Sequence, residues 1–450
     1  SSAMTSTGND RYRGTIPGQA RGQVIQFYVR GQDFAGGVSH FPAAAENSRA
    51  LIQVNDNQAR LDQLHNLRII MLSSDTSLLF RNTNRMSNDR LGATVVYDEK
   101  TVYYNVRVRL KGSAFGRFNG GHFGFNIEFD PDNLFRGVHG TISVERSNPV
   151  KEIFANHLLT RTGTPGFSAL NDVGRLIAPS ATGTCLFAMA RQTSEFFEGL
   201  FGDNSDEGTL FNHELLYNPN GTTGGAEGLK INNPYNHTGG RYDLRDRGPD
   251  QEPYRWGFQI RSQRDRDDYS SIVGANRAMS LSGQALQDAA ELHVDIDQWT
   301  RAFAAMSLIG NDDTYSRIWE HNLRYYARPT DNRLIVLPWD LDRAFQLSTS
   351  ASLIGGNNVA KLLNFPQNRR RFYGHILDLV ETTFNNSYAS SWASHLGSVT
   401  GSSAGGYLSF VNSRASFAMS QLPASIPFTI TTSGGAGFSV PGTSTVLRGN

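Results

Sequence analysis

The sequence predicts an α+β fold, because two kinds of periodicity occupy different stretches of the chain. Residues 94–129 alternate apolar and polar positions, the pattern of strands with one buried face. Residues 297–309 place apolar side chains three and four positions apart, as an amphipathic helix does. Residues 323–337 form two short apolar runs around a turn, which predicts a β-hairpin. Helices and strands therefore combine in one mixed core.

The first part of the chain predicts a small β unit. Residues 18–72 contain short alternating segments, such as residues 24–29 and 67–71, with turn residues between them. No apolar stretch reaches the length of about 18 residues that a membrane span needs. We therefore expect residues 1–88 to be an N-terminal β segment and linker, with no membrane-spanning helix.

The strand that begins at Val102 has two chemically different faces. An apolar face is expected from Val102, Tyr104, Val106, Val108 and Leu110, and the opposite face from Tyr103, Asn105, Arg107, Arg109 and Lys111. The second face carries three cations at two-residue spacing. This arrangement predicts a basic stripe on one side of the sheet, or a plain solvated strand face.

A glycine-rich connection follows this strand. Residues 112–121 contain four glycines and lead into another alternating segment, residues 123–129. Glycines permit close backbone approach, and a strand, glycine loop and strand can cover phosphate groups with backbone amides. The candidate phosphate-binding residues are Arg107, Arg109, Lys111, Gly112, Ser113 and Arg117. The alternative is an ordinary hairpin with a long loop.

A helix, a loop and a hairpin then place three polar side chains at one end. Asp297 is the expected N-cap of the helix, and Gly310 can end it in the left-handed conformation. Asp313 follows in the loop, Asn322 opens the hairpin and Asp340 closes it. Since a hairpin folds back on itself, we expect these three groups to converge.

The order acid, amide and acid is the order that kinase-like phosphoryl transfer uses. Asp313 would orient the accepting hydroxyl, while Asn322 and Asp340 would hold a divalent metal, with Asp342 as a further metal ligand. The spacings of nine and eighteen residues differ from the protein-kinase pattern. A lone aspartate after a helix is more often a loop cap without chemistry, so the combination carries the prediction.

Composition excludes some classes of function. The 450 residues include 42 basic and 41 acidic side chains, and this net charge of +1 argues against wholesale nucleic-acid binding. Only five of the basic residues are lysines, and a single cysteine, Cys185, excludes a disulfide framework within the chain. The scarcity of lysine makes Lys111 the expected phosphate partner among them, together with arginines.

Five motifs together resemble the spore-coat protein H (CotH) kinase family of bacteria. They are residues 109–113 (Arg-Leu-Lys-Gly-Ser), 294–297 (Val-Asp-Ile-Asp), 311–313 (Asn-Asp-Asp), Asn322 and residues 338–342 (Pro-Trp-Asp-Leu-Asp). The resemblance covers residues 90–385. It implies an atypical, two-lobed protein-kinase-like core that binds ATP with Mg²⁺, or with Mn²⁺ or Ca²⁺. It also implies a protein substrate and an extracellular or cell-surface location.

The resemblance also implies domain boundaries. Residues 1–88 resemble the end of an immunoglobulin-like unit, residues 89–385 would be the kinase-like domain, and residues 386–450 a helical, Ser/Gly-rich tail that runs into a β segment. Three positions depart from the family pattern: His122 and Asn212 stand where lysine is usual, and Arg191 where glutamate is usual. These departures affect the part of the expected site that would hold the nucleotide, and not the part that would bind the metal.

Three functions fit these observations. The first is a metal-dependent protein kinase that transfers the γ-phosphoryl group of ATP to Ser or Thr hydroxyls. The second is a degenerate kinase fold that serves as a binding or structural module of an extracellular protein, with a cation bound by the acids. The third is a hydrolase that uses Asp313 and Asp340 as a carboxylate pair.

Overall fold

The computed structural model describes most of the chain, in two compact units. The residues outside the description are 1, 113–116, 118–122, 147, 164–169, 190–193, 214–242, 318–320, 425–429, 438, 440–441, 443–445 and 448–450. Unit 1 comprises residues 1–146 and 174–185, and unit 2 comprises residues 147–173 and 186–450. Both helices and strands are present, which confirms the α+β class. The boundaries at residues 88 and 385 stay predictions.

A closed barrel of seven strands makes up most of unit 1, and only residues 171–173 and 186–188 at the ends of two of its strands are assigned to unit 2. In sequence order the strands are β7 (His65–Ile70), β8 (Leu91–Tyr97), β9 (Thr101–Lys111), β10 (Gly124–Glu128), β11 (Thr141–Glu145), β12 (Asn171–Ala178) and β13 (Ala181–Ala188). Around the barrel the order is β10-β11-β13-β12-β7-β8-β9. The neighbouring strands β7 and β12 pair in parallel, with Leu67 opposite Leu176. The expected two-lobed kinase-like core stays a prediction.

The residues before the barrel form three separate two-stranded sheets. They pair β1 (Thr5–Gly8) with β2 (Arg11–Arg13), β3 (Val24–Gln26) with β6 (Leu51–Gln53), and β4 (Val29–Gln32) with β5 (Val38–Phe41). A short 3-10 helix, η1 (Ala45–Asn47), precedes β6, and α1 (Ser73–Leu79) follows β7. The β character expected for this part of the chain is present, and its immunoglobulin-like ancestry stays a prediction.

A bulge in β9 corrects the predicted division of its two faces. Asn105 has a positive φ of 55°, and the pairing with β8 shifts there, so that Ala93 faces Val106 but Val95 faces Tyr103. The extra residue moves the side chains before it to the opposite faces of the sheet. Tyr103 is consequently buried, although strict alternation would place it on the polar face. The side-chain oxygen of Asn105 accepts a 2.7 Å hydrogen bond from the backbone N–H of Arg49, which holds the bulge.

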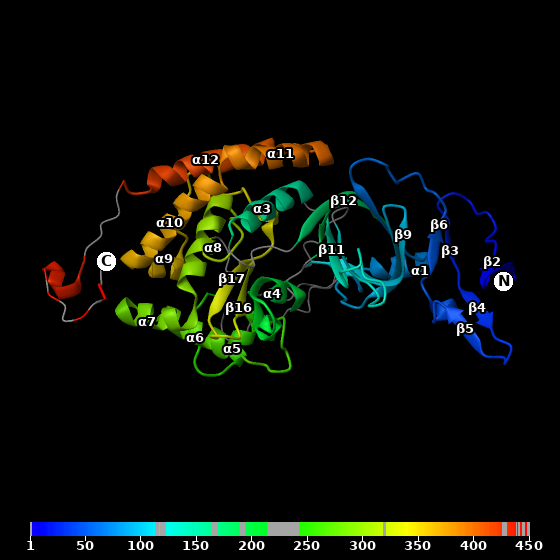
Figure 1. Ribbon diagram of the computed structural model, residues 1–450, viewed down its shortest axis with the longest axis horizontal. Helices are drawn as coiled ribbons and strands as arrows, with labels where there is room; N and C mark the ends of the chain where they lie inside the picture. Colours follow the sequence, from blue (N-terminus) through cyan, green and yellow to red (C-terminus); the bar gives the residue numbers. More distant parts are fainter. Residues whose placement is uncertain are drawn as a thin grey trace. The chain divides into compact units, whose positions relative to one another are not determined.

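Unit 2 surrounds a four-stranded antiparallel sheet with helices (Figure 1). The sheet order is β15 (Phe258–Ile260), β14 (Thr209–His213), β16 (Leu323–Ala327) and β17 (Leu334–Pro338). Earlier helical segments are α3 (Pro149–Arg161), α4 (Ser194–Phe201), η2 (Ser205–Glu207), α5 (Glu252–Arg255), α6 (Ser270–Ser280), α7 (Gly283–His293) and α8 (Ile296–Ile309). Later ones are η4 (Leu341–Arg343), α9 (Asn357–Leu363), α10 (Pro366–Thr382), α11 (Asn386–Thr400), α12 (Gly405–Gln421) and η5 (Thr432–Gly435).

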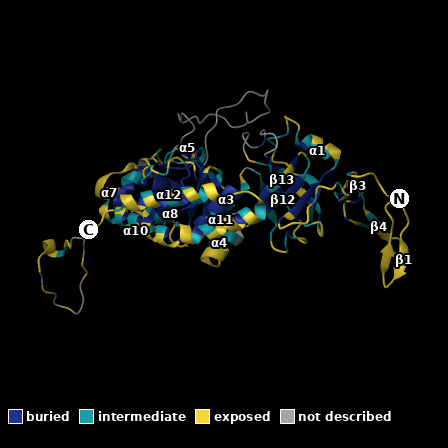
Figure 2. Cartoon of the chain, turned by 90° about the horizontal axis from the view of Figure 1, so that it is seen from above, coloured by how far each residue is buried: buried dark blue, intermediate teal, exposed yellow. Residues whose placement is uncertain are grey.

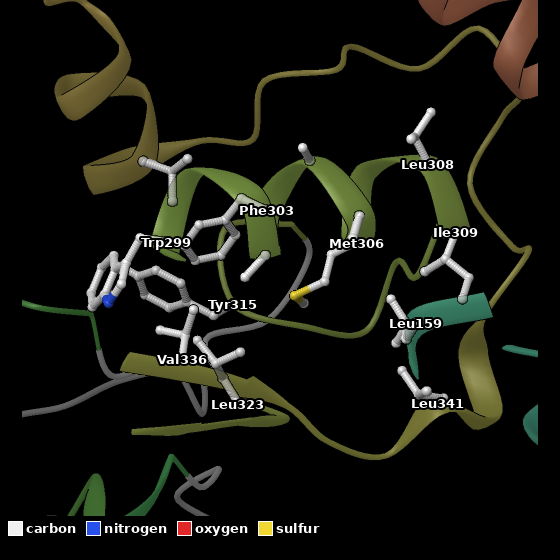
Figure 3. Close-up of a cluster of buried hydrophobic side chains, with 14 of the residues drawn as sticks. Leu159, Trp299, Phe303, Met306, Leu308, Ile309, Tyr315, Leu323, Val336 and Leu341 are labelled. Carbon is white, nitrogen blue, oxygen red and sulfur yellow. The ribbon is translucent and has the colours of Figure 1, made fainter. Parts of the chain in front are cut away.

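Helix α8 is the centre of the core of unit 2. Its side chains Trp299, Phe303 and Met306 point toward the β16–β17 hairpin, as Figure 3 shows. The indole N–H of Trp299 donates a 2.9 Å hydrogen bond to the carbonyl of Leu334 in β17. Burial of this apolar face at about 25 cal/mol per Å² is the main attraction between helix and hairpin. The predicted helix and hairpin are both confirmed.

The N-cap of α8 is Asp295, so the expectation of Asp297 is wrong. The carboxylate of Asp295 accepts a 3.1 Å hydrogen bond from the backbone N–H of Gln298, and Asp297 lies inside the first turn. At the other end Gly310 has φ 65°, as predicted. An added Cβ at Gly310 would lie 2.3 Å from the ring of Phe410, so packing as well as conformation requires glycine.

Helices α10 and α12 pack against α8, and α11 packs against α3. Figure 2 shows α8 mostly buried, whereas α11 and α12 carry exposed residues beside buried ones. Arg414 of α12 is fully buried and donates to the carbonyls of Ser307, Thr349 and Ala351. None of the described helices is both long enough and apolar enough to cross a membrane.

Candidate active site

The loop after α8 is held by a buried amide. The side-chain oxygen of Asn311 accepts a 3.0 Å hydrogen bond from the backbone N–H of Asp313, which forms a tight turn. Its Nδ2 donates to the backbone carbonyl of Asp340 at 3.4 Å. Asn311 is fully buried. This one side chain therefore joins the helix end to the segment that follows β17.

Asp313 and Asn322 are in direct contact. The Nδ2 of Asn322 donates to the backbone carbonyl of Asp313 at 2.9 Å and to its Oδ2 at 3.3 Å. The other carboxylate oxygen, Oδ1, lies 2.7 Å from the Nε2 of His321. Asp313 is thus held from two sides, and the relative exposure of its side chain to solvent is 25%. Sequence reasoning missed His321, whose position just before Asn322 was a signal.

These contacts also define which atom of Asn322 remains available. Both hydrogen bonds of the side chain use Nδ2, so the amide orientation follows from the acceptors that surround it. Its Oδ1 makes no hydrogen bond within the described residues. Asn322 has a positive φ of 53°, and its backbone carbonyl accepts a 3.3 Å hydrogen bond from the N–H of Trp339. The start and the end of the hairpin are therefore adjacent.

Asp340 is exposed, and backbone hydrogen bonds to Asn311 and, through Trp339, to Asn322 tie its segment to the Asp313–Asn322 pair. It has left-handed backbone angles, φ 58° and ψ 78°, at the start of η4. In the described portion of the chain its carboxylate makes no hydrogen bond and no ion pair, although its carbonyl is bonded to Asn311. The structure therefore brings together Asn311, Asp313, Asn322 and the backbone of Asp340, and leaves the Asp340 carboxylate available.

Asp312 and Asp342 belong to an ionic cluster beside the Asp313–Asn322 pair. Asp312 is buried and forms a bidentate ion pair with Arg343, with distances of 3.0 Å from Nε and 2.6 Å from Nη2. These hydrogen bonds, opposed by partial burial, raise the pKa of Arg343. Asp342 is half-buried in η4, which packs against α3. The cluster therefore connects the loop after α8 to η4 and to α3.

Lys151 is a cation of this cluster that sequence reasoning missed. It lies in the first turn of α3, is only 6% exposed, and has the carboxylates of Asp342, Glu152 and Asp312 near enough to attract its charge. Burial nevertheless lowers its pKa. Its ammonium makes no hydrogen bond and no ion pair with any residue that the structure describes. The signal was its spacing with Ala155 and Leu158, which places it on the apolar face of the helix.

The predicted phosphate-binding residues of β9 lie in unit 1 and have protein partners. Arg107 forms an ion pair with Glu128, and Lys111 with Glu145. Lys111 reaches Glu145 across Gly124, where a Cβ would lie 3.2 Å from the Cβ of Lys111. The absence of a side chain at this position is what permits the crossing.

The other residues of the predicted phosphate site also have contacts within unit 1. Arg109 donates to the side chain of Asn88 at 3.2 Å. Arg117 is buried and donates to the carbonyl of Gly112 at 2.7 Å and to those of Arg85 and Ser87 at 3.0 and 2.9 Å. Gly112 has φ 91°. Ser113 lies outside the described residues.

Of the three positions that depart from the CotH family pattern, Asn212 is the one that the structure describes. Asn212 is buried in β14, and its side-chain oxygen accepts a 3.2 Å hydrogen bond from the Nε of Arg324. The guanidinium of Arg324 also lies 3.4 Å from the ring centroid of Trp339, next to Asp340. His122 and Arg191 lie outside the described residues. Among the described residues, no three His, Cys, Asp or Glu side chains are grouped to hold a metal ion.

Comparison with known proteins finds a match to a kinase family over part of the chain. Residues 215–404 match the model of the CotH kinase protein family, and this stretch lies within unit 2. The match confirms the predicted resemblance to the CotH kinase family over these residues. It includes Asp313, Asn322, Asp340 and Asp342.

Two solved structures are similar to the chain. One is the proinflammatory kinase CtkA of Helicobacter pylori, with 10% identity and a TM-score of 0.31, covering 66% of this chain and 90% of that chain. The other is the HipA and HipB toxin–antitoxin complex with operator DNA of Shewanella oneidensis MR-1, with 11% identity and a TM-score of 0.25, covering 83% of this chain and 77% of that chain. No curated protein matches the chain.

Proposed function

We propose that this chain is a metal-dependent phosphotransferase that transfers the γ-phosphoryl group of ATP to Ser or Thr hydroxyls of secreted or surface proteins of a bacterium. The observation that carries the proposal is the Asp313–Asn322 contact, together with Asp340, whose backbone is bonded to Asn311 and whose carboxylate has no partner among the described residues. All three residues lie within the stretch that matches the CotH kinase family. The two-lobed architecture and the extracellular location belong to the same proposal.

Asp313 is proposed as the residue that orients the accepting hydroxyl. Among the described residues each of its carboxylate oxygens has one donor, His321 or Asn322, which leaves a lone pair for a substrate hydroxyl. In the reaction the hydroxyl oxygen bonds to the γ-phosphorus as the bond to the β-phosphate oxygen breaks. The hydroxyl proton passes to Asp313, and ADP leaves.

Asn322 and Asp340 are proposed as the residues that hold the metal. Mg²⁺ binds through one or two carboxylates together with water and substrate phosphates, so a site with two available protein oxygens fits it. The Oδ1 of Asn322 and the carboxylate of Asp340 are such oxygens, and Asp342 is proposed as a further ligand. When bound, Mg²⁺, or Mn²⁺ or Ca²⁺ in its place, neutralises charge on the transferred phosphoryl group.

The predicted phosphate-binding residues of unit 1 stay part of the proposal. They are Arg107, Arg109, Lys111, Gly112, Ser113 and Arg117. Guanidinium groups bind phosphate oxygens in pairs, so the arginines suit this role even where a family lysine is replaced. Glu128 and Glu145 would then compete with the nucleotide for Arg107 and Lys111.

Transfer of ³²P from [γ-³²P]ATP tests this function. We expect the parent protein with Mg²⁺ to label itself or a casein acceptor, and Asp313→Asn to lose most of the labelling. Asp265→Asn is the matched control, because Asp265 is an exposed aspartate of unit 2 with no partner among the described residues. An inactive parent with Mg²⁺, Mn²⁺ and Ca²⁺ would favour the alternative, a kinase fold that serves as a binding or structural module.

A further inference from the structure

The proposed function does not use the charge of Lys151, a cation of the ionic cluster. A lysine ammonium transferred out of water is costly unless it is paired and hydrogen-bonded. Lys151 is 6% exposed as a whole, and its Nζ, which still reaches solvent, has no hydrogen-bonding partner among the described residues. Its neighbours Asp342, Glu152 and Asp312 attract it only through space. An ammonium so placed has three donors left for a ligand.

The position of Lys151 favours the binding of an anionic ligand near Asp340. Lys151 is the third residue of α3, whose thirteen residues begin at Pro149. The N-cap Asn148 makes no side-chain capping bond, so the first turn of α3 adds its own partial positive charge. Helix α3 packs against η4, the segment that begins immediately after Asp340. Lysine and helix end therefore place positive charge next to the proposed metal-binding carboxylates.

The packing around Lys151 keeps the first turn of α3 in place. Phe154, Leu158 and Leu159 of α3 are fully buried in the core of unit 2. Figure 3 shows Leu159 and Leu341 on the same side of Ile309, at the end of α8. A lysine on such a fixed turn is positioned before any ligand arrives, which lowers the entropy lost on binding.

We propose that Lys151 binds a phosphate group of the nucleotide at the Asp340–Asp342 end of the site. This inference rests on the proposed function, and it adds a phosphate-binding lysine from α3 of unit 2. Lys111, the lysine that the sequence predicts for this role, is already paired with Glu145. Asp342, Glu152 and Asp312 attract the ammonium through space and leave its three donors unused by the described residues.

An acyl phosphate of ATP tests the assignment on the unaltered protein. Such a probe transfers its acyl group to a nearby lysine amine: an amide bond forms at Nζ, the bond between acyl carbon and phosphate oxygen breaks, and ATP leaves. The chain has only five lysines, Lys100, Lys111, Lys151, Lys230 and Lys361, so peptide mass spectrometry can assign the product. We expect acylation of Lys151 that excess ATP prevents and excess adenosine does not. Acylation of Lys111 or Lys230 instead would overturn the assignment.

Substitution of Lys151 tests the charge itself. We expect Lys151→Met to weaken the binding of ATP with Mg²⁺ by about tenfold or more, because a charge-assisted hydrogen bond is lost. Adenosine affinity should be unchanged, since adenosine has no phosphate. Lys151→Arg should stay within a few-fold of the parent, as should Lys100→Met, which removes an exposed lysine. Methionine fills similar volume, so Lys151→Met should fold, and urea unfolding checks this.

Different results would overturn the proposed function and the proposed role of Lys151. A parent protein that binds no ATP in the presence of metal overturns both the function and the role of Lys151. A parent that binds ATP while Lys151→Met binds it equally well overturns the role of Lys151 alone. In that case Lys151 only balances the charge of its three acidic neighbours, and the variant should lose stability and keep its affinity.

Discussion

At the scale of single residues, the site depends on how Asp313 is held. His321 is buried, with 6% exposure, and its Nε2 contacts Asp313 opposite the contact from Asn322. A carboxylate fixed by two neighbours keeps one orientation toward a substrate hydroxyl. We therefore propose that His321 acts by positioning Asp313 and does not contact the substrate.

His321→Ala should therefore impair turnover and spare nucleotide binding. We expect kcat for phosphoryl transfer to fall about 10- to 100-fold, the range seen when a supporting hydrogen bond to a site residue is lost. The dissociation constant of ATP should stay within twofold. Steady-state kinetics and a nucleotide titration measure the two quantities.

His321→Gln is the matched variant, because a glutamine amide can donate to Asp313 in place of the imidazole. It should recover most of the lost kcat. Equal losses of kcat in His321→Ala and His321→Gln would contradict the positioning role, as would a parallel loss of ATP affinity.

At the scale of elements, the ion pair between Asp312 and Arg343 fastens the loop after α8 to η4. The side chain of Asp312 is 10% exposed and that of Arg343 is 48% exposed. Removal of the arginine leaves a nearly buried carboxylate without its partner. We expect Arg343→Met to lower the free energy of unfolding by about 1–2 kcal/mol, a buried-pair value reduced because Arg343 is half exposed.

Urea unfolding followed by tryptophan fluorescence measures this loss. All five tryptophans, Trp256, Trp299, Trp319, Trp339 and Trp392, belong to unit 2, so the signal reports that unit. The double variant Asp312→Asn with Arg343→Met should regain part of the stability, since a neutral amide is easier to bury than a carboxylate. Parent-like stability of Arg343→Met would show that the pair contributes nothing.

Gly310 fixes the direction in which the chain leaves α8. Alanine there would adopt a strained φ near 65° and overlap the ring of Phe410. We expect Gly310→Ala to destabilise unit 2 by about 2–4 kcal/mol, from backbone strain and overpacking together. The same urea experiment measures it. Adding Phe410→Leu should recover the overpacking part alone, and full recovery would show that the backbone conformation is not strained.

At the scale of the whole molecule, half-buried histidines make stability depend on pH. Burial, with a further contribution from Arg161, lowers the pKa of His157, and burial lowers that of His293. The unfolded chain takes up these protons near pH 6.5, whereas the native chain does so only at lower pH. Native stability from these groups is therefore fully present above pH 6.5 and is lost as the pH falls through the native pKa values.

We expect the free energy of unfolding of unit 2 to decrease from pH 7 to pH 5. In His157→Gln with His293→Gln, which cannot titrate, the decrease should be smaller. Glutamine at position 157 can keep a hydrogen bond to Tyr388, which His157 contacts at 2.8 Å. Tryptophan-monitored unfolding at several pH values checks this, and identical slopes for parent and variant would refute it.

The sequence predicted local features of the fold well. The hydrophobic periods of α8 and of the β16–β17 hairpin are strong, and Gly310 marks the helix end, so these elements follow from neighbouring residues alone. The barrel does not, because β7 and β12 pair in parallel from distant segments. The bulge at Asn105 was not predicted either, because it depends on a hydrogen bond with Arg49 and not on a local sequence pattern.

The same limit applies to the site. Asp313, Asn322 and Asp340 flank elements that fold back on each other, so their proximity was predictable. Lys151 was not, because it comes from a helix more than 150 residues earlier in the chain, and only the tertiary packing of α3 on η4 brings it there.

The binding of ATP with and without Mg²⁺, followed by tryptophan fluorescence, tests the central claim most directly. Trp339 is adjacent to Asp340 and provides a local signal. We expect the parent to bind ATP at least about tenfold more tightly with Mg²⁺ than without it, and Asp340→Asn to lose this difference while Asp265→Asn retains it. Equal affinity with and without metal, or full metal dependence in Asp340→Asn, would contradict a metal held by Asn322 and Asp340.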